Sequence, residues 1–270
     1  MRDIVYPAVV AAAKTWFKLG DVRIAMSGTE HIPREGGALV AVNHLSFVDY
    51  VMAGYPGVER GRLTRFMAKK EVFDHPVGGP VMRSFHHIAI DRGDARAGLD
   101  AARRYLDAGE LVGIFPEGTI SRSFHHQPLK TGAVRIAADA GVPLIPIVLW
   151  GTQRFLTKGK PRDFSRHRTV GIEVGEPMHP TLQDNANALT GELQTRMEAM
   201  LDRLITAYPA EEQPPGSWWL PASYGGSAPT PEEAAAMYAE ERRLRAQKKA
   251  QKKAQKRTKS KANGKTDPDR

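Results

Sequence analysis

Three polar clusters follow short apolar segments, and their residue types could support acid–base chemistry and anion binding. The clusters are Asn43-His44 with Asp49, Asp91-Arg92, and Glu117-Gly118-Thr119. Functional side chains of α/β proteins gather at the carboxyl ends of the sheet strands. Because three separate segments show the same pattern, the sequence predicts one site at this edge of a sheet.

His44 and Asp49 could form a general-base pair. Five residues on one helix lie about 140° apart, so the two side chains would not share a helix face. Residues 46–49 fit a capping box with Ser46 as N-cap, which predicts a helix that continues to about Gly54. His44 would then lie in the preceding turn and could fold back to Asp49, which would fix the imidazole tautomer. The spacing alone slightly favours the alternative, in which Asp49 only caps the helix.

The other two clusters suggest anion binding. The guanidinium of Arg92 could bind phosphate oxygens in a bidentate manner, although a surface ion pair with Asp91 is a commoner arrangement. Glu117-Gly118-Thr119 offers a carboxylate, a flexible glycine and a hydroxyl. The alternative is an ordinary turn at the end of a strand. Arg122 would add positive charge nearby.

Strands are expected to alternate with helices through residues 22–205, which predicts an α/β fold with a largely parallel mixed sheet flanked by helices. The expected strands are 22–26, 37–42, 65–69, 88–90, 111–115, 142–150 and 169–174, and the main expected helices are 3–19, 96–108, 132–140 and 189–205. We expect four regions: an amphipathic, membrane-facing helix (1–24), the main domain (25–208), a C-terminal arm (209–245) and a basic low-complexity tail (246–270) that is disordered or only transiently helical.

The composition excludes several functions. The 270 residues include no cysteine, so disulfides, thiolate zinc sites and a cysteine nucleophile are excluded. Thirteen of the 39 Lys and Arg residues and three of the 30 acidic residues lie in 241–270, so residues 1–240 are almost neutral. The basic tail could attract anionic lipids, bind nucleic acid or simply be solvated. No stretch approaches the ~20 apolar residues that cross a bilayer, and the apolar run at 4–13 is not typical of a signal peptide.

Four segments in order resemble the diagnostic blocks of the glycerophospholipid acyltransferases. Residues 43–49 match the H-x-x-x-x-D block, and residues 115–119 match the block with Glu-Gly-Thr. Residues 88–92 resemble the intervening block that ends in Arg, and residues 142–146 resemble the proline-containing block. The similarity covers roughly residues 25–205. It departs at Ile120, where the family often has Arg, and at His86, where it commonly has Gly.

The resemblance implies a single acyltransferase domain. It implies transfer of a fatty acyl group from acyl-CoA or acyl carrier protein to the free hydroxyl of 1-acylglycerol-3-phosphate, giving phosphatidic acid in phospholipid biosynthesis. His44 would be the general base and Asp49 its partner. The acyl group would move directly, and neither a metal nor another cofactor is implied. The residues implied in acceptor binding are Arg92, Glu117, Gly118 and Thr119, with Arg122 in place of the missing arginine.

Other functions stay open from the sequence. The acceptor could be another lysophospholipid or a glycolipid, because Ile120 departs from the family. A non-catalytic adaptor could bind membranes or nucleic acid through the tail, although we do not expect a nucleic-acid partner. A metal hydrolase based on His86-His87 and His125-His126 is not favoured, since adjacent histidines cannot easily ligate one ion. We expect a peripheral or monotopic protein at the cytoplasmic face of the cell membrane.

Overall fold

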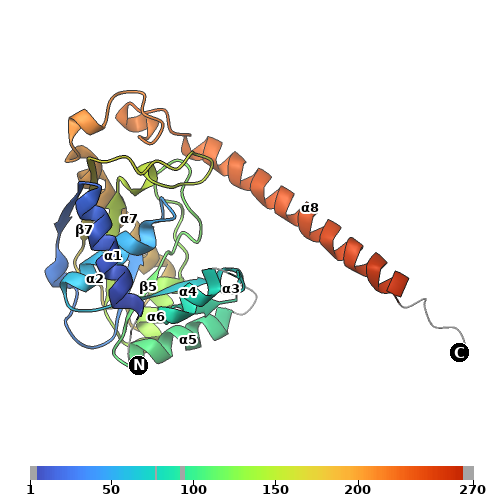
Figure 1. Cartoon of the computed structure of the whole chain (residues 1–270). Coiled ribbons are helices and arrows are strands. Elements are labelled where there is room, and N and C mark those ends of the chain that lie inside the picture. The colour runs from blue at the N-terminus through green and yellow to red at the C-terminus, as the bar shows by residue number, and fades with distance from the viewer. Residues whose placement is uncertain (1–4, 77, 92–94, 264–270) are drawn as a thin grey trace, which may run out of the picture.

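The computed structural model describes residues 5–76, 78–91 and 95–263, which form a body built around one sheet and a long helix, α8, that projects from it (Figure 1). The helices are α1 Val5–Leu19, α2 Asp49–Glu59, α3 Lys70–Phe73, α4 Gly78–Ser84, α5 Ala95–Asp107, α6 Gly132–Ala140, α7 Ala186–Thr206 and α8 Pro231–Asn263. The strands are β1 Val22–Ser27, β2 Ala38–Val42, β3 Thr64–Lys69, β4 Ile88–Ile90, β5 Leu111–Ile114, β6 Leu144–Trp150 and β7 Arg168–Val174.

The seven strands form one sheet in the order β1-β7-β6-β2-β5-β3-β4. Strands β2 to β6 pair in parallel, whereas β7 runs antiparallel to β6 and parallel to β1. This confirms the predicted largely parallel mixed sheet. Strand β2 lies between β5 and β6, so the segments that follow these three strands leave the sheet at the same edge.

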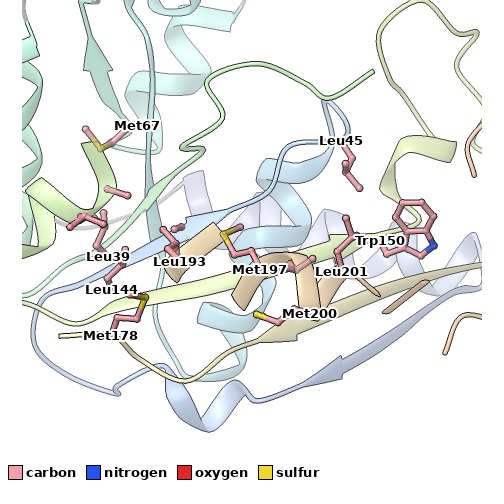
Figure 2. Close-up of a cluster of buried hydrophobic side chains, with 14 of the residues drawn as sticks. Leu39, Leu45, Met67, Leu144, Trp150, Met178, Leu193, Met197, Met200 and Leu201 are labelled. Atoms are coloured by element: carbon pink, nitrogen blue, oxygen red, sulfur yellow. The ribbon is translucent and has the colours of Figure 1, made fainter. Parts of the chain in front are cut away.

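Helices cover both faces of the sheet, and the alternation of side chains along β2 shows how. Leu39 and Ala41 belong to a core shared with α5, α6 and α7, whereas Ala38, Val40 and Val42 belong to a core shared with α1 and α2. All five residues are fully buried, as expected for a central strand with two covered faces. Figure 2 shows the first core, in which Leu193, Met197 and Leu201 of α7 lie in one cluster with Leu144 and Trp150 of β6.

The start of α2 differs from the sequence prediction. Ser46 was the expected N-cap, but Val48 is the N-cap and α2 begins at Asp49. The hydroxyl of Ser46 accepts the N–H of Val48 and donates to the carbonyl of Leu156, so it is not available to cap the helix at Asp49. Residues 43–48 therefore form an irregular segment, which we call the His44 turn.

The C-terminal arm packs on the body through Trp219. Its ring lies against Trp150, with centroids 6.1 Å apart, and the guanidinium of Arg154 lies over it at 4.5 Å. Helix α8 then begins with a capping box, in which Thr230 and Glu233 each accept the other's backbone N–H, and with Pro231 at the first helical position.

Helix α8 continues to Asn263, whereas we expected disorder or transient helix from residue 246. Alanine, glutamine and lysine are strong helix formers, which accounts for the continuation. In the described part of the chain, no helix has both the length and the apolar character needed to span a membrane. The boundaries between the four expected regions stay predictions.

Candidate active site

The side chain of Asn43 fixes the place where the chain leaves β2. Its amide oxygen accepts the N–H of Leu149 at 2.8 Å, and its amide nitrogen donates to the carbonyl of Leu149 at 3.0 Å. The side chain thereby continues the β2–β6 ladder for one more step after Val42, while the main chain turns away from the sheet. The His44 turn is thus held against the end of β6.

The structure brings His44 and Asp49 into the expected contact. Nδ1 of His44 lies 2.9 Å from Oδ2 of Asp49, and Asp49 is fully buried. The same carboxylate oxygen accepts the N–H groups of Leu45 at 2.6 Å and Ser46 at 2.7 Å. Because an ionised carboxylate only accepts, His44 donates from Nδ1, and Nε2 carries the lone pair.

Thr152 completes the shell of donors around Asp49, and sequence reasoning missed it. Its hydroxyl donates to Oδ1 of Asp49 at 2.6 Å, and the threonine is fully buried. Thr152 lies in a 3₁₀ turn, Thr152–Arg154, just beyond the end of β6. The rule that located the other clusters could have found it, because Thr152 is a polar residue two positions after the predicted strand 142–150.

Aromatic rings position the imidazole of His44. Phe115 stacks on it with centroids 4.3 Å apart and planes 28° apart, and Tyr50 meets it edge-on at 6.0 Å. Burial and the nearby charge of Asp49 raise the pKa of Tyr50 to about 12, so its phenol stays neutral. Among the described residues, Nε2 of His44 has no hydrogen-bond partner, so it can accept a proton from a ligand.

An apolar groove lies beside these rings. It runs between α1 and α2, with Tyr50 in its wall; other residues of the lining are Val9, Ala13, Phe17, Val51 and Tyr55. Its lining is almost entirely apolar, as is typical of a site for a hydrocarbon chain.

His87 also lines this groove, as a neutral imidazole. Its Nδ1 accepts the N–H of Phe66 at 3.1 Å. Burial, followed by the charges of Arg65 and His86, lowers the pKa of His87 to about 4. Within the described ranges, no group of three or more His, Asp and Glu side chains could hold a metal ion.

The Glu117-Gly118-Thr119 loop lies directly against the His44 turn. Oε1 of Glu117 accepts the backbone N–H of His44, and Oε2 accepts the N–H of Gln127, both at 2.9 Å. Both carboxylate oxygens are therefore bound by the protein's own backbone. Gly118 has φ of +69°, a left-handed conformation that favours glycine and allows the sharp turn after β5.

Thr119 and Arg122 lie in a cluster of charged side chains that the sequence did not predict. Lys158 donates to the hydroxyl of Thr119 at 2.9 Å. Arg122 and Lys158 both contact Oε2 of Glu241 on α8, at 3.4 Å and 3.5 Å. We call Arg122, Lys158 and Glu241 the cation cluster. Arg92, the remaining candidate, lies outside the described residues.

Fold and site together define an α/β domain with a buried histidine–aspartate pair at the carboxyl edge of a mostly parallel sheet. Residues 23–150 match the family model described as Acyltransferase. The chain is 29% identical over 185 residues to the 1-acyl-sn-glycerol-3-phosphate acyltransferase of Bacillus subtilis. This alignment covers 65% of the chain and 86% of the relative. It is 28% identical over 197 residues to the chloroplastic 1-acyl-sn-glycerol-3-phosphate acyltransferase LPAT1 of Arabidopsis thaliana. Here the alignment covers 70% of the chain and 53% of the relative.

A solved structure shows the same fold. The 1-acyl-sn-glycerophosphate acyltransferase of Thermotoga maritima superposes with a TM-score of 0.60 at 23% identity, over 77% of this chain and 86% of the other. The chain spans about half the length of two chloroplastic relatives: it covers 53% of LPAT1 of Arabidopsis thaliana and 46% of the 1-acyl-sn-glycerol-3-phosphate acyltransferase BAT2 of Brassica napus. Residues 23–150 thus carry a similarity to the acyltransferase family model, and the relatives named above are acyltransferases that act on 1-acylglycerol 3-phosphate.

Proposed function

We propose that this protein is an O-acyltransferase that acylates the free hydroxyl of 1-acylglycerol-3-phosphate and so forms phosphatidic acid. The observation that carries the proposal is the 2.9 Å contact between His44 Nδ1 and Asp49 Oδ2, with Nε2 left to accept a proton. The relatives named as 1-acyl-sn-glycerol-3-phosphate acyltransferases support the choice of acceptor.

The proposed reaction is a direct transfer from a thioester to an alcohol. Nε2 of His44 takes the proton of the acceptor hydroxyl as its oxygen attacks the thioester carbonyl carbon. Asp49 stabilises the imidazolium that forms. The tetrahedral intermediate then collapses, the C–S bond breaks, and the departing thiolate takes the proton from the imidazolium. The products are an ester and a free thiol, and no acyl group is attached to the enzyme.

The surroundings of His44 suggest where the substrates bind. The apolar groove has Tyr50 in its wall, the ring that meets the His44 imidazole edge-on, and it suits a fatty acyl chain. Glu117 holds the backbone N–H of His44, so we assign it to positioning the turn rather than to contact with substrate. Arg92, Gly118, Thr119 and Arg122 stay in the proposal as the residues that receive the acceptor's glycerol phosphate.

The donor and the setting are further parts of the proposal. Acyl-CoA or acyl carrier protein would supply the acyl group, with no other cofactor, in phospholipid biosynthesis. The protein would act as a peripheral or monotopic protein at the cytoplasmic face of the cell membrane, with α1 facing the lipid and the basic end of α8 attracting anionic lipids. We expect no nucleic-acid partner.

A second candidate is acylation of another lysophospholipid or a glycolipid. Ile120 favours it, because this residue is 3% exposed and cannot supply the positive charge of the arginine that the family often has there. A panel of lysolipids with and without a phosphate monoester separates the two candidates.

The deciding experiment is a thiol-release assay with acyl-CoA and lysophosphatidic acid. His44→Ala should reduce kcat by at least ~10³-fold, since it removes the general base and its tautomer control. His179→Ala, a change at an exposed histidine, is the matched control and should keep full activity. Full acyl transfer by a folded His44→Ala protein would refute the proposal and favour a non-catalytic adaptor.

A further inference from the structure

We propose that Arg122 and Lys158 form a binding site for a phosphate monoester, and that the carboxylate of Glu241 on α8 occupies this site until the phosphate displaces it. This deepens the proposed function, because it names residues that would receive a phosphate-bearing substrate. Lys158 and Glu241 were not among the candidates from the sequence.

The geometry of the cation cluster is that of an anion site. Arg122 Nη2 and Lys158 Nζ approach one oxygen atom, Oε2 of Glu241, from two different loops, at 3.4 Å and 3.5 Å. Gly159 has φ of +72°, and a Cβ there would lie 3.3 Å from Nη1 of Arg122, so the glycine leaves room for the guanidinium. The three charged side chains are between 18% and 25% exposed, so an anion from solvent can reach them.

The cluster is tied to the turn that carries His44. The N–H of Ser121 donates to the carbonyl of His44 at 2.7 Å, and the hydroxyl of Thr157 donates to the carbonyl of Leu45 at 2.7 Å. Each of these residues directly precedes one of the two cations in the sequence. A ligand held by Arg122 and Lys158 is therefore attached to the two loops that border the reactive imidazole.

The charges favour a dianion over a single carboxylate. Arg122, Lys158 and Arg245 all pair with Glu241, so its one negative charge leaves two positive charges uncompensated, whereas a phosphate monoester carries about −1.5 to −2 near neutral pH. The buried Nε of Arg122 has no hydrogen-bond partner among the described residues, so the guanidinium keeps a spare donor. Burial and the positive charges of Arg122 and Arg245 lower the pKa of Lys158, although Glu241 opposes this effect. The site therefore has an excess of positive charge.

Helix α8 links occupancy of the site to its own attachment. The hydroxyl of Tyr238 accepts the N–H of Arg122 at 2.7 Å and donates to the carbonyl of Ile120 at 3.0 Å. Glu241 follows three residues later, on the same face of the helix. The first turns of α8 thus hold the loop at residues 120–122 through one hydroxyl and one carboxylate. A phosphate that takes the place of Glu241 removes one of these two attachments.

Calorimetric titration of the full chain with soluble phosphates tests the site without requiring acyl transfer. The ligands are glycerol 3-phosphate against glycerol, for the acceptor head group, and CoA against dephospho-CoA, for the donor's phosphate monoester. The variants are Glu241→Gln and Lys158→Met. Glu240→Gln is the matched control, because Glu240 is exposed and pairs with Arg243. Thermal melting of each variant checks that it is folded.

We expect Glu241→Gln to tighten binding of glycerol 3-phosphate about threefold and Lys158→Met to weaken it about tenfold, with no change for Glu240→Gln. If these changes appear instead for CoA and not for dephospho-CoA, the site holds the donor's phosphate, which also supports the anion site. Unchanged phosphate binding by Glu241→Gln, or by a folded Lys158→Met, overturns the proposal.

Steady-state kinetics gives a second readout. Glu241→Gln should lower the KM for the substrate whose phosphate the titrations identify, with kcat unchanged, and Lys158→Met should abolish this gain in the double variant. A raised KM in Glu241→Gln would contradict the displacement. If no variant of the chain transfers acyl groups, the proposed function fails, whereas the titrations still decide on the anion site.

Discussion

The His44 turn and the cation cluster are adjacent, yet they are held together in different ways. The turn is fixed by a fully buried carboxylate that accepts two backbone N–H groups, an imidazole and a hydroxyl, all from 2.6 to 2.9 Å. The cation cluster relies on long, partly exposed side chains that meet across 3.4 to 3.5 Å between two loops and α8. The first arrangement is preorganised, and the second can exchange its partners without unfolding.

The strongest test of this contrast is Asp49→Asn. All the groups around Asp49 donate hydrogen bonds to its carboxylate. The NH₂ group of an asparagine is itself a donor, so the amide cannot hold His44, Leu45 and Ser46 as the carboxylate does. We expect kcat to fall by roughly 10³ to 10⁴-fold, through loss of the correct imidazole tautomer. Thiol-release kinetics measures the loss. An active Asp49→Asn enzyme would show that the turn does not depend on this carboxylate.

The apolar groove and the cation cluster should also differ in their response to acid. In the groove, the depressed pKa of His87, about 4, means that the unfolded chain binds more protons than the folded one between pH ~4 and ~6.5. Stability is therefore lost as pH falls through this window, by up to roughly 3 kcal/mol. In the cation cluster, burial raises the pKa of Glu241, but the charges of Lys158, Arg245 and Arg122 outweigh it and hold this pKa below its usual value.

Urea unfolding at several pH values checks this prediction. His87→Asn keeps an acceptor for the N–H of Phe66 and does not titrate, so its stability should vary less between pH ~6.5 and ~4 than that of the unmodified chain. His179→Asn should leave the pH dependence unaltered. Identical slopes for His87→Asn and the unmodified protein would exclude His87 as the source.

Thr152→Val probes the turn more gently. Valine has nearly the same shape but leaves Oδ1 of Asp49 without its hydroxyl donor, and a buried group left unsatisfied costs about 1–3 kcal/mol. We expect kcat to fall about tenfold, with KM for the acceptor unchanged. Thr190→Val, at a buried threonine of α7, is the control. An equal loss in both variants would point to general destabilisation.

The smallest effect on chemistry should come from removing residues 246–270, which contain ten Lys and Arg residues and two acids. Glu241 remains, together with its partner Arg245, so the cation cluster is preserved. We expect weaker binding to vesicles that contain phosphatidylglycerol, at about 1 kcal/mol per basic residue near the surface, with turnover of detergent-dispersed substrate unaltered. Vesicle binding that does not change would rule out the lipid role of the tail.

The difference between the two regions also explains what the sequence could predict. The sheet follows from local patterns, because apolar runs indicate strands. The spacing of His44 and Asp49 allowed their contact but slightly favoured a capping role for Asp49, and the resemblance to the acyltransferases pointed to the contact. Ser46 was misread as the N-cap because its hydroxyl is drawn to Leu156, a residue 110 positions away. Lys158 and Glu241 were missed because they meet Arg122 only through tertiary packing, and neither lies at a strand end.

The amide of Asn43 has a consequence for how the sequence of this protein can vary. By copying the two hydrogen bonds of a peptide group, it lets the main chain depart from the sheet without ending the β2–β6 alignment. His44 therefore lies a fixed two positions after Val42, the last residue of β2. An insertion between Val42 and His44 would move the imidazole away from Asp49 and Phe115.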